Sequence, residues 1–330
     1  MASFAGVRRP IDLSRLDAVE ERRVPGAPVC IRAAADGLDL AGWAEAHRSR
    51  VDTALSIGGS VLFRGFAVAQ VEDFERAAEA LCSDLHPGYG DLPRESLGGR
   101  IYGSTPYPAD RPILFHNEGS HTAQWPGRIV FCCRVPPARG GATPTADGRR
   151  VYATLSPATR RLFSERALRY TRNFTPGLDV DWKDFFGTGA KAAVESRCRA
   201  EGVDVEWRAG GGLRIRQVRP AILRRGGDPV FFNQVLLHHP ATLPSDVREA
   251  LASLGPEEDF PRHVAFGDGS PIPERVVEEV VGALESSAVE APWEKGDVLL
   301  VDNVLAAHGR RAFEGERKIV VAMGAMEKSG

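Results

Sequence analysis

The sequence lacks any apolar run long enough to cross a membrane, and its N-terminus has no apolar core like that of a secretory signal. It also lacks a strong charge of either sign, because 42 Lys and Arg residues stand against 44 Asp and Glu residues. A net charge of -2 gives no field that would attract nucleic acid or an acidic membrane surface. We therefore expect a globular protein that binds neither nucleic acid nor a membrane. The composition leaves open whether it forms a homo-oligomer.

Cysteine is scarce, odd in number and without a recognisable pattern. The five cysteines form no Cys-x-x-Cys pair, and Cys132 and Cys133 are adjacent inside an apolar run. This distribution argues against a disulfide framework and against a cysteine zinc site. We interpret the cysteines as reduced, mostly buried thiols, which are typical of a cytoplasmic protein.

No internal repeat or low-complexity tract divides the 330 residues, so we expect a single domain. Residues 1–35 are rich in Arg, Pro and Ala, and we expect them to wrap the surface. Helical spacing of apolar residues predicts helices over 40–55, 71–85 and 148–165, with two more between 244 and 287. Apolar segments rich in β-forming residues predict strands within 58–68, 128–135, 227–240, 295–313 and 316–326.

The order of these segments bears on the fold class. The apolar strands lie at the middle and end of the chain, and no regular alternation of strand and helix appears. That order favours a β-sandwich or barrel decorated with helices over a doubly wound sheet. Residues from about 174 to 214 are charged, glycine-rich and irregular, so we expect an irregular, lid-like insertion that covers a site.

One stretch, "FHNEGSHTAQWP" (115–126), contains two potential metal ligands two positions apart, His116 and Glu118. Side chains at i and i+2 face the same side of a strand, so the two can bind one ion if the segment is extended. The preceding residues, "RPILF", are typical of a strand. An imidazole nitrogen with a carboxylate oxygen suits iron, manganese or zinc. A stable site needs a third ligand from elsewhere in the chain.

His308 is the most informative candidate for that third ligand. It ends the strand-like run "VLLVDNVLAAH", and three arginines follow it closely. Two histidines and one carboxylate on one face of an ion leave three positions open, which is the signature of non-haem iron(II) oxygenases. Zinc also accepts three such ligands, with a water as the fourth. The other histidines considered are His47, His86, His238, His239 and His263.

Five ordered motifs in this chain resemble a known family. They are "GGSVLFRGFAV", "FHNEGSHTAQWPGRIVFCCRVPPARGGATPTAD", "YTRNF", "FFNQVLLHHP" and "LLVDNVLAAHGRRAFEGERKIVVAM". Together they are similar to the taurine-dioxygenase-like family of Fe(II)/2-oxoglutarate-dependent oxygenases, and within it to the syringomycin-pathway-type branch of amino-acid hydroxylases. The resemblance spans about residues 55–326. It implies a mainly β fold with a double-stranded β-helix, or jelly-roll, core and packed helices.

The resemblance also implies roles for individual residues. His116, Glu118 and His308 would be the catalytic iron ligands. Thr143, in "GGAT", would hydrogen-bond the distal carboxylate of 2-oxoglutarate, and Arg317 would pair with that carboxylate. Two other arginines, Arg310 and Arg311, could take the place of Arg317, because all three follow His308 within nine positions.

The substrate side of the implied site is less well defined. Asn233 and Gln234, in "FFNQ", stand where this branch lines the substrate or cofactor pocket, and His121 is expected at the pocket rim. The chain departs from the branch beside this pocket. Gly119 and His121 replace a larger apolar residue and an aromatic, and Ala142 stands where an acidic residue is common. These departures bear on the identity of the substrate more than on the cofactor.

The activity that the resemblance implies is hydroxylation of an unactivated C–H bond in an amino acid or amino-acid derivative, free or carrier-tethered, during biosynthesis of a natural product such as an antibiotic. The cofactor and cosubstrates would be Fe(II), 2-oxoglutarate and O2. Related halogenases replace the carboxylate ligand with a small residue, so Glu118 favours hydroxylation. Desaturation and cyclisation use the same ligands and stay open. A non-catalytic jelly-roll binding protein and a zinc hydrolase are two further alternatives, but neither explains why Thr143 and Arg317 would be present.

Overall fold

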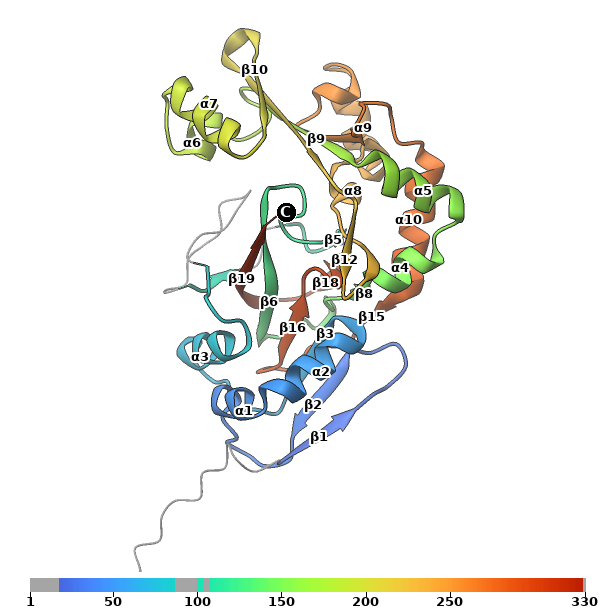
Figure 1. Ribbon diagram of the computed structural model, residues 1–330. Coiled ribbons are helices and arrows are strands. Elements are labelled where there is room, and N and C mark those ends of the chain that lie inside the picture. Colours follow the sequence, from blue (N-terminus) through green and yellow to red (C-terminus); the bar gives the residue numbers. More distant parts are fainter. Residues whose placement is uncertain (1–17, 87–99, 104–106, 329–330) are drawn as a thin grey trace, which may run out of the picture.

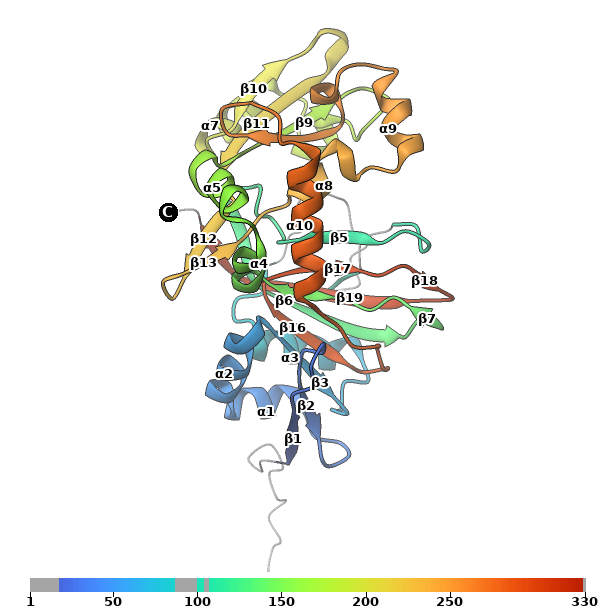
Figure 2. The same cartoon turned by 90° about the vertical axis from the view of Figure 1, so that its right-hand side faces the viewer.

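Two facing β-sheets form the core of the computed structural model, which describes residues 18–86, 100–103 and 107–328 (Figures 1 and 2). The larger sheet contains, in spatial order, β1 (Val19–Arg22), β2 (Val29–Ala33), β3 (Ser60–Arg64), β16 (Val298–Asp302), β6 (Gln124–Val135), β19 (Lys318–Lys328) and β4 (Tyr102–Gly103). The smaller sheet contains β15 (Ala288–Val289), β8 (Thr145–Asp147), β17 (Ala306–Arg310) and β5 (Ile113–His116). Except for the parallel pair β2 and β3, neighbouring strands are antiparallel.

His116 and His308, on the smaller sheet, lie in the space between the two sheets. The ring of His308, on β17, lies 5.3 Å from the ring of Phe131, on β6, so the sheets meet face to face at this point. Residues alternate along β6: Val130 and Cys132 join the core under the N-terminal helices, while Ile129 joins a small cluster with Val321 on the other face. This arrangement confirms the expected mainly β core with a jelly-roll design.

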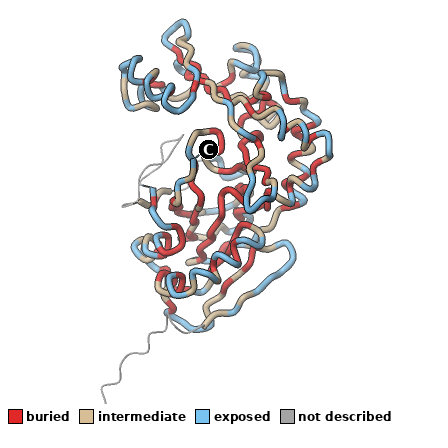
Figure 3. The backbone as a smooth tube through the Cα atoms, in the orientation of Figure 1, coloured by how far each residue is buried: buried red, intermediate tan, exposed pale blue. Residues whose placement is uncertain are grey.

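Helices cover the outer faces of both sheets. Three helices pack on the larger sheet through a core that includes Trp43, Phe63 and Phe74: α1 (Leu40–Ala46), α2 (Arg48–Gly58) and α3 (Val71–Leu81). Three others cover the smaller sheet: α4 (Gly148–Thr154), α5 (Pro157–Arg166) and α10 (Glu274–Ser287). Figure 3 shows the buried backbone running between these layers. The single helix predicted over 40–55 is in fact two helices, α1 and α2. Each of the segments predicted to contain a strand does contain one.

The N-terminal region differs from the expectation of a surface wrap. Residues 1–17 lie outside the described part, but β1 and β2 form a hairpin that extends the larger sheet. Val29 and Ile31 are buried because alternate residues of β2 face the core. The Arg and Pro residues of this region suggested a surface segment. The alternation of buried and partly exposed residues in β2 covers only five positions, which is too few to be recognised in the sequence.

The segment from about 174 to 214 is folded instead of irregular. It contains α6 (Trp182–Phe186), α7 (Lys191–Ala200) and β10 (Asp204–Trp207), and these pack on a cluster of their own around Phe174 and Trp182. A second four-stranded sheet carries the segment: β10, β11 (Leu213–Arg219), β9 (Leu168–Phe174) and β14 (Arg262–Phe266). In Figure 1 this unit lies above the jelly roll, which places it over one end of the core.

Short elements complete the chain. They are β7 (Arg139–Gly140), η2 (Ala209–Gly211), β12 (Ile222–Arg225), β13 (Asp228–Phe231), α8 (Val235–His238), η3 (Pro240–Thr242), α9 (Ser245–Ala252), η4 (Glu257–Asp259) and β18 (Phe313–Glu314). None of the described helices has the length and apolar character needed to span a membrane. All five cysteines are free thiols, and four of them are buried.

Candidate metal centre and its surroundings

Three potential metal ligands meet between the sheets. One ligand atom each from His116, Glu118 and His308 lies within 4.8 Å of the others. The backbone explains the meeting, because His308 on β17 is the direct cross-strand partner of His116 on β5. Their ring centroids are 4.3 Å apart, and Nε2 of His116 is 3.8 Å from Oε2 of Glu118. The set of two imidazoles and one carboxylate fits a divalent transition metal such as iron(II).

The orientation of His116 supports a metal-binding role. Its Nδ1 lies 2.9 Å from the carbonyl oxygen of Leu114, and because a carbonyl only accepts, Nδ1 carries the proton. Nε2 is then the nitrogen that is left to bind a metal ion, and it faces Glu118. Metal-binding histidines are commonly held in this way, with the nitrogen that does not bind the metal donating to a carbonyl or carboxylate.

Glu118 reaches the site by a turn and not by an extended strand. Strand β5 ends at His116, and the chain turns through Gly119, whose φ is +68°. The predicted strand parity therefore does not explain why the two ligands converge. The turn is instead held by Asn303. Its side-chain oxygen accepts from the backbone N–H of Glu118 at 2.7 Å, and its amide nitrogen donates to the Glu118 carbonyl at 2.8 Å.

Asn303 is fully buried and also donates to the carbonyl of Pro126 at 2.8 Å. We predict that Asn303→Ala weakens iron(II) binding by about 10- to 100-fold, as is usual when a group that orients a metal ligand is lost. The measurement is anaerobic titration of the protein with iron(II). Val304→Ala is the matched control. Val304 is the next residue after Asn303, and its side chain is buried in a small apolar cluster. If both variants lose stability but bind iron(II) alike, Asn303 has only a structural role.

The structure does not support the expectation that Asn233 and Gln234 contact substrate. The Asn233 side chain donates to the Ala221 carbonyl and accepts from the Val235 N–H. Gln234 donates from its side chain to the Asn117 carbonyl at 3.0 Å. Both residues are buried, and neither lines the cavity described below. The backbone of Asn233 and the side chain of Gln234 instead hold Asn117, the residue that follows His116.

Thr143 and Arg317, both expected at the 2-oxoglutarate site, do lie together. Arg317 donates from Nη2 to the Thr143 hydroxyl at 3.3 Å and from Nε to the Gly141 carbonyl at 2.9 Å. Among residues 18–86, 100–103 and 107–328, no carboxylate is within ion-pair distance of Arg317. Burial, reinforced by the nearby charge of Arg310, lowers the pKa of Arg317 to about 10. The side chain is thus still a cation at neutral pH, and a ligand carboxylate would complete it.

The other two arginines have different environments. Arg310 is buried, and its guanidinium donates to the carbonyls of Tyr107, Pro108 and Arg111, so it fixes the loop that precedes β5. Arg311 is bound to two carboxylates, those of Glu285 and Glu290. Of the three arginines, Arg317 is the one that lies beside Thr143 without a carboxylate partner among the described residues.

Gly141 keeps the space that Arg317 occupies. Its φ is +66°, and an added Cβ would come within 2.7 Å of Pro137 Cγ and 3.1 Å of Arg317 Cδ. We predict that Gly141→Ala raises the KM for 2-oxoglutarate by about tenfold, since displacement costs Arg317 roughly one charge-assisted hydrogen bond. Gly26→Ala is the control, because Gly26 has a φ of +79° but nothing within 4 Å of an added Cβ. If both variants bind 2-oxoglutarate alike, the clash does not reach the cosubstrate site.

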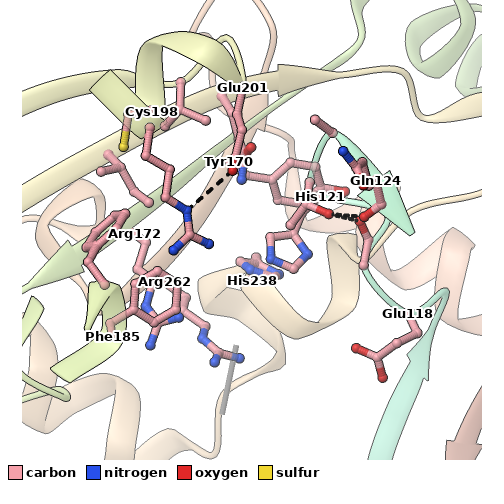
Figure 4. Close-up of a pocket in the computed structure, with 18 of the residues that line it drawn as sticks. Glu118, His121, Gln124, Tyr170, Arg172, Phe185, Cys198, Glu201, His238 and Arg262 are labelled. Carbon is pink, nitrogen blue, oxygen red and sulfur yellow. Dashed lines mark hydrogen bonds and ion pairs between the residues drawn. The ribbon is translucent and has the colours of Figure 1, made fainter. Parts of the chain in front are cut away.

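A cavity of about 350 Å³ opens beside the triad, between the jelly roll and the sheet of β9 and β11. Figure 4 shows Glu118 on one side of the cavity and His121 on its wall. The rings of His121, His238 and Tyr170 are mutually close, with centroids 5.1–5.9 Å apart. His238, which the sequence offered only as a further candidate for the third metal ligand, also lines this cavity.

Arg172 and Arg262 also line the cavity, and the sequence analysis did not identify either of them as a site residue. Tyr170 and Arg172 stand at i and i+2 of "YTRNF", so strand parity could have placed them on one face. No comparable signal marks Arg262, whose place depends on the pairing of β14 with β9.

Comparison with known proteins gives relatives over most of the chain. The dapdiamide synthesis protein DdaC of Enterobacter agglomerans is 37% identical over 277 residues, which cover 83% of this chain and 84% of that protein. A clavaminate synthase-like protein of Arabidopsis thaliana is 32% identical over 289 residues, with 83% of each chain covered.

Solved structures share the fold. The crystal structure of PvcB from Pseudomonas aeruginosa matches with a TM-score of 0.55 at 14% identity, over 93% of this chain and 91% of that one. PvcB is an Fe, alpha-ketoglutarate dependent oxygenase from an isonitrile synthetic pathway. At the level of sequence, residues 22–323 match the family described as "Taurine catabolism dioxygenase TauD, TfdA family". The chain therefore belongs to this family of iron(II)- and 2-oxoglutarate-dependent oxygenases.

Proposed function

We propose that this protein hydroxylates an unactivated C–H bond of an amino acid or amino-acid derivative. The observation that carries the proposal is that Glu118 takes part in two features of the structure. It belongs to the cluster of three ligands and also lines the cavity of about 350 Å³. A substrate in this cavity would lie directly beside the metal position, and ligand sites commonly begin at roughly 300 Å³.

The residues divide the work of binding. His116, Glu118 and His308 would hold iron(II), while Arg317 and Thr143 would hold the distal carboxylate of 2-oxoglutarate. Bound iron(II), with 2-oxoglutarate and O2, supplies the oxidation: one oxygen atom enters the substrate, the other enters succinate, and CO2 leaves. The protein's own task is to orient the substrate carbon and to exclude water from the site.

Two lines of support concern the substrate and the outcome. The relationship to DdaC, a dapdiamide synthesis protein, supports a place in the assembly of a natural product. Glu118 would occupy the third ligand position, which favours hydroxylation over halogenation. Desaturation or cyclisation would use the same residues and is the second candidate outcome. The five free thiols support a reducing compartment such as the cytoplasm.

The test is succinate release measured against a panel of free and carrier-loaded amino acids, followed by mass spectrometry of the products. The proposal predicts a gain of one oxygen atom in a product that forms only with iron(II), 2-oxoglutarate and O2. A loss of two hydrogens would instead indicate desaturation or cyclisation. Turnover that persists without O2 would contradict the proposal and favour a zinc hydrolase.

A further inference from the structure

The cavity has a cationic wall opposite its metal side. Arg172 on β9 and Arg262 on β14 are direct cross-strand partners in an antiparallel pair. Side chains that are directly opposite in such a pair emerge on the same face of the sheet. Both line the cavity, and Figure 4 shows them away from Glu118, with His121 and His238 in between.

Arg172 is held firmly in place. Its guanidinium lies over the rings of Phe174 and Phe185, at 4.7 Å and 4.5 Å from their centroids. Its Nε approaches Oδ2 of Asp179 at 3.4 Å, and only 8% of the residue is exposed. These contacts fix the position of the charge, and through Phe185 they join helix α6 to the wall of the cavity.

Arg262 differs from the other charged residues of this wall. In the part of the chain that the structure describes, its guanidinium forms no hydrogen bond or ion pair, although the residue is partly buried. Arg197, the third arginine on the cavity, is paired with Glu201 at 3.4 Å. Two like charges directly opposite each other are destabilising unless something compensates them. Asp179 already compensates Arg172, so among the described residues the charge that still lacks a partner is that of Arg262, which favours an anion beside its guanidinium group.

We propose that Arg262, supported by Arg172, binds a free carboxylate of the substrate at the end remote from the carbon that is oxidised. This inference rests on the proposed function and deepens it, because it names the substrate class. A guanidinium presents a planar pair of donors that matches a carboxylate. The substrate would span from this wall to Glu118, with its middle against His121, His238 and Tyr170.

The size of the cavity favours a small free acid over a carrier-bound group. A volume of about 350 Å³ is near the lower end for ligand pockets, and Arg262 lies inside it on a β-strand. A thioester-tethered amino acid would have no free α-carboxylate to offer. The phosphate of a carrier arm is the other source of an anion, and the test separates the two.

The experiment uses full-length protein, anaerobically loaded with iron(II) and 2-oxoglutarate, and measures binding of proteinogenic amino acids and of their carboxamides by calorimetry. Succinate release and product mass are then measured in air. We expect the best-bound acid to lose about 100-fold in affinity in Arg262→Gln, as is typical for one partner of a buried charge pair. Wild-type protein should bind the matching carboxamide about as weakly as the variant binds the acid.

Arg197→Gln is the matched control, because Arg197 lines the same cavity but is already paired with Glu201. It should bind the acid within about threefold of wild type, since exposed pairs contribute little. Arg262→Gln should keep wild-type affinity for 2-oxoglutarate, which shows that the site is otherwise intact.

The inference is overturned if no acid binds wild-type protein, if acid and carboxamide bind alike, or if Arg262→Gln binds the acid normally. It is also overturned if Arg262→Gln impairs only carrier-loaded substrates, because the anion would then be the arm's phosphate. Acid binding that depends on Arg262 without any oxidised product would leave the inference standing and contradict the proposed hydroxylation.

Discussion

Glu118→Ala is expected to lower the rate of succinate formation at least about 1,000-fold. This loss is larger than the roughly 10- to 100-fold loss that follows when only a hydrogen bond to a metal ligand is removed. The reason is that Glu118 supplies the only carboxylate of the three-ligand cluster found among the described residues. Without it, two imidazoles alone would have to hold iron(II). The rate is measured with the substrate identified by the panel, at saturating iron(II) and 2-oxoglutarate.

The control for this prediction is Glu201→Ala. Glu201 also lines the cavity, but its carboxylate pairs with Arg197 on helix α7 and is absent from the ligand cluster. We expect this variant to retain activity within about threefold, because an exposed ion pair contributes little. Full hydroxylation by Glu118→Ala would show that the assignment of the metal site is wrong.

The second large effect is expected from Arg317→Met, which should raise the KM for 2-oxoglutarate by about 100-fold, since breaking one partner of a buried charge pair costs roughly 3 kcal/mol. Arg317 already contacts Thr143, and burial lowers its pKa to about 10 without making it neutral at pH 7. The charge is therefore in place for the distal carboxylate. Steady-state kinetics with varied 2-oxoglutarate measure the effect.

Arg311→Met is the matched control, because Arg311 is bound by Glu285 and Glu290 near the surface. Its KM for 2-oxoglutarate should stay within about twofold of wild type. Without 2-oxoglutarate, Arg317→Met should melt no lower than wild type, since a buried cation lacking a carboxylate partner adds little to stability. An unchanged KM in Arg317→Met, or an effect of equal size in Arg311→Met, would assign the cosubstrate to another residue.

Local sequence patterns predicted most elements of the fold. Amphipathic spacing identified α3 and α10, and apolar β-forming runs identified β6, β16 and β19. The patterns failed where a strand or helix is decided by its neighbours. Strand β2 is too short to stand out beside Arg and Pro. The segment from about 174 to 214 folds because Phe174 and Trp182 pack in a small hydrophobic cluster whose members are spread too far along the chain to form a local pattern.

The candidate site was predictable only in part, for similar reasons. The sequence indicated His116, Glu118 and His308 because the first two lie only two positions apart and the third ends an apolar, strand-like run. Asn303, which holds the Glu118 turn, could not be found, since a buried amide in a strand-like run gives no sign of its partner. Arg262 depends on the register between β14 and β9, which the sequence does not specify.

The convergence of His116, Glu118 and His308 on one metal ion is tested most directly by the visible absorption spectrum of the protein with iron(II) and 2-oxoglutarate under anaerobic conditions. A weak charge-transfer band should appear only when both are present, and it should be absent from His308→Ala at the same concentrations. A wild-type protein that shows no band at saturating iron(II) and 2-oxoglutarate, or a band that survives in His308→Ala, would contradict the shared site.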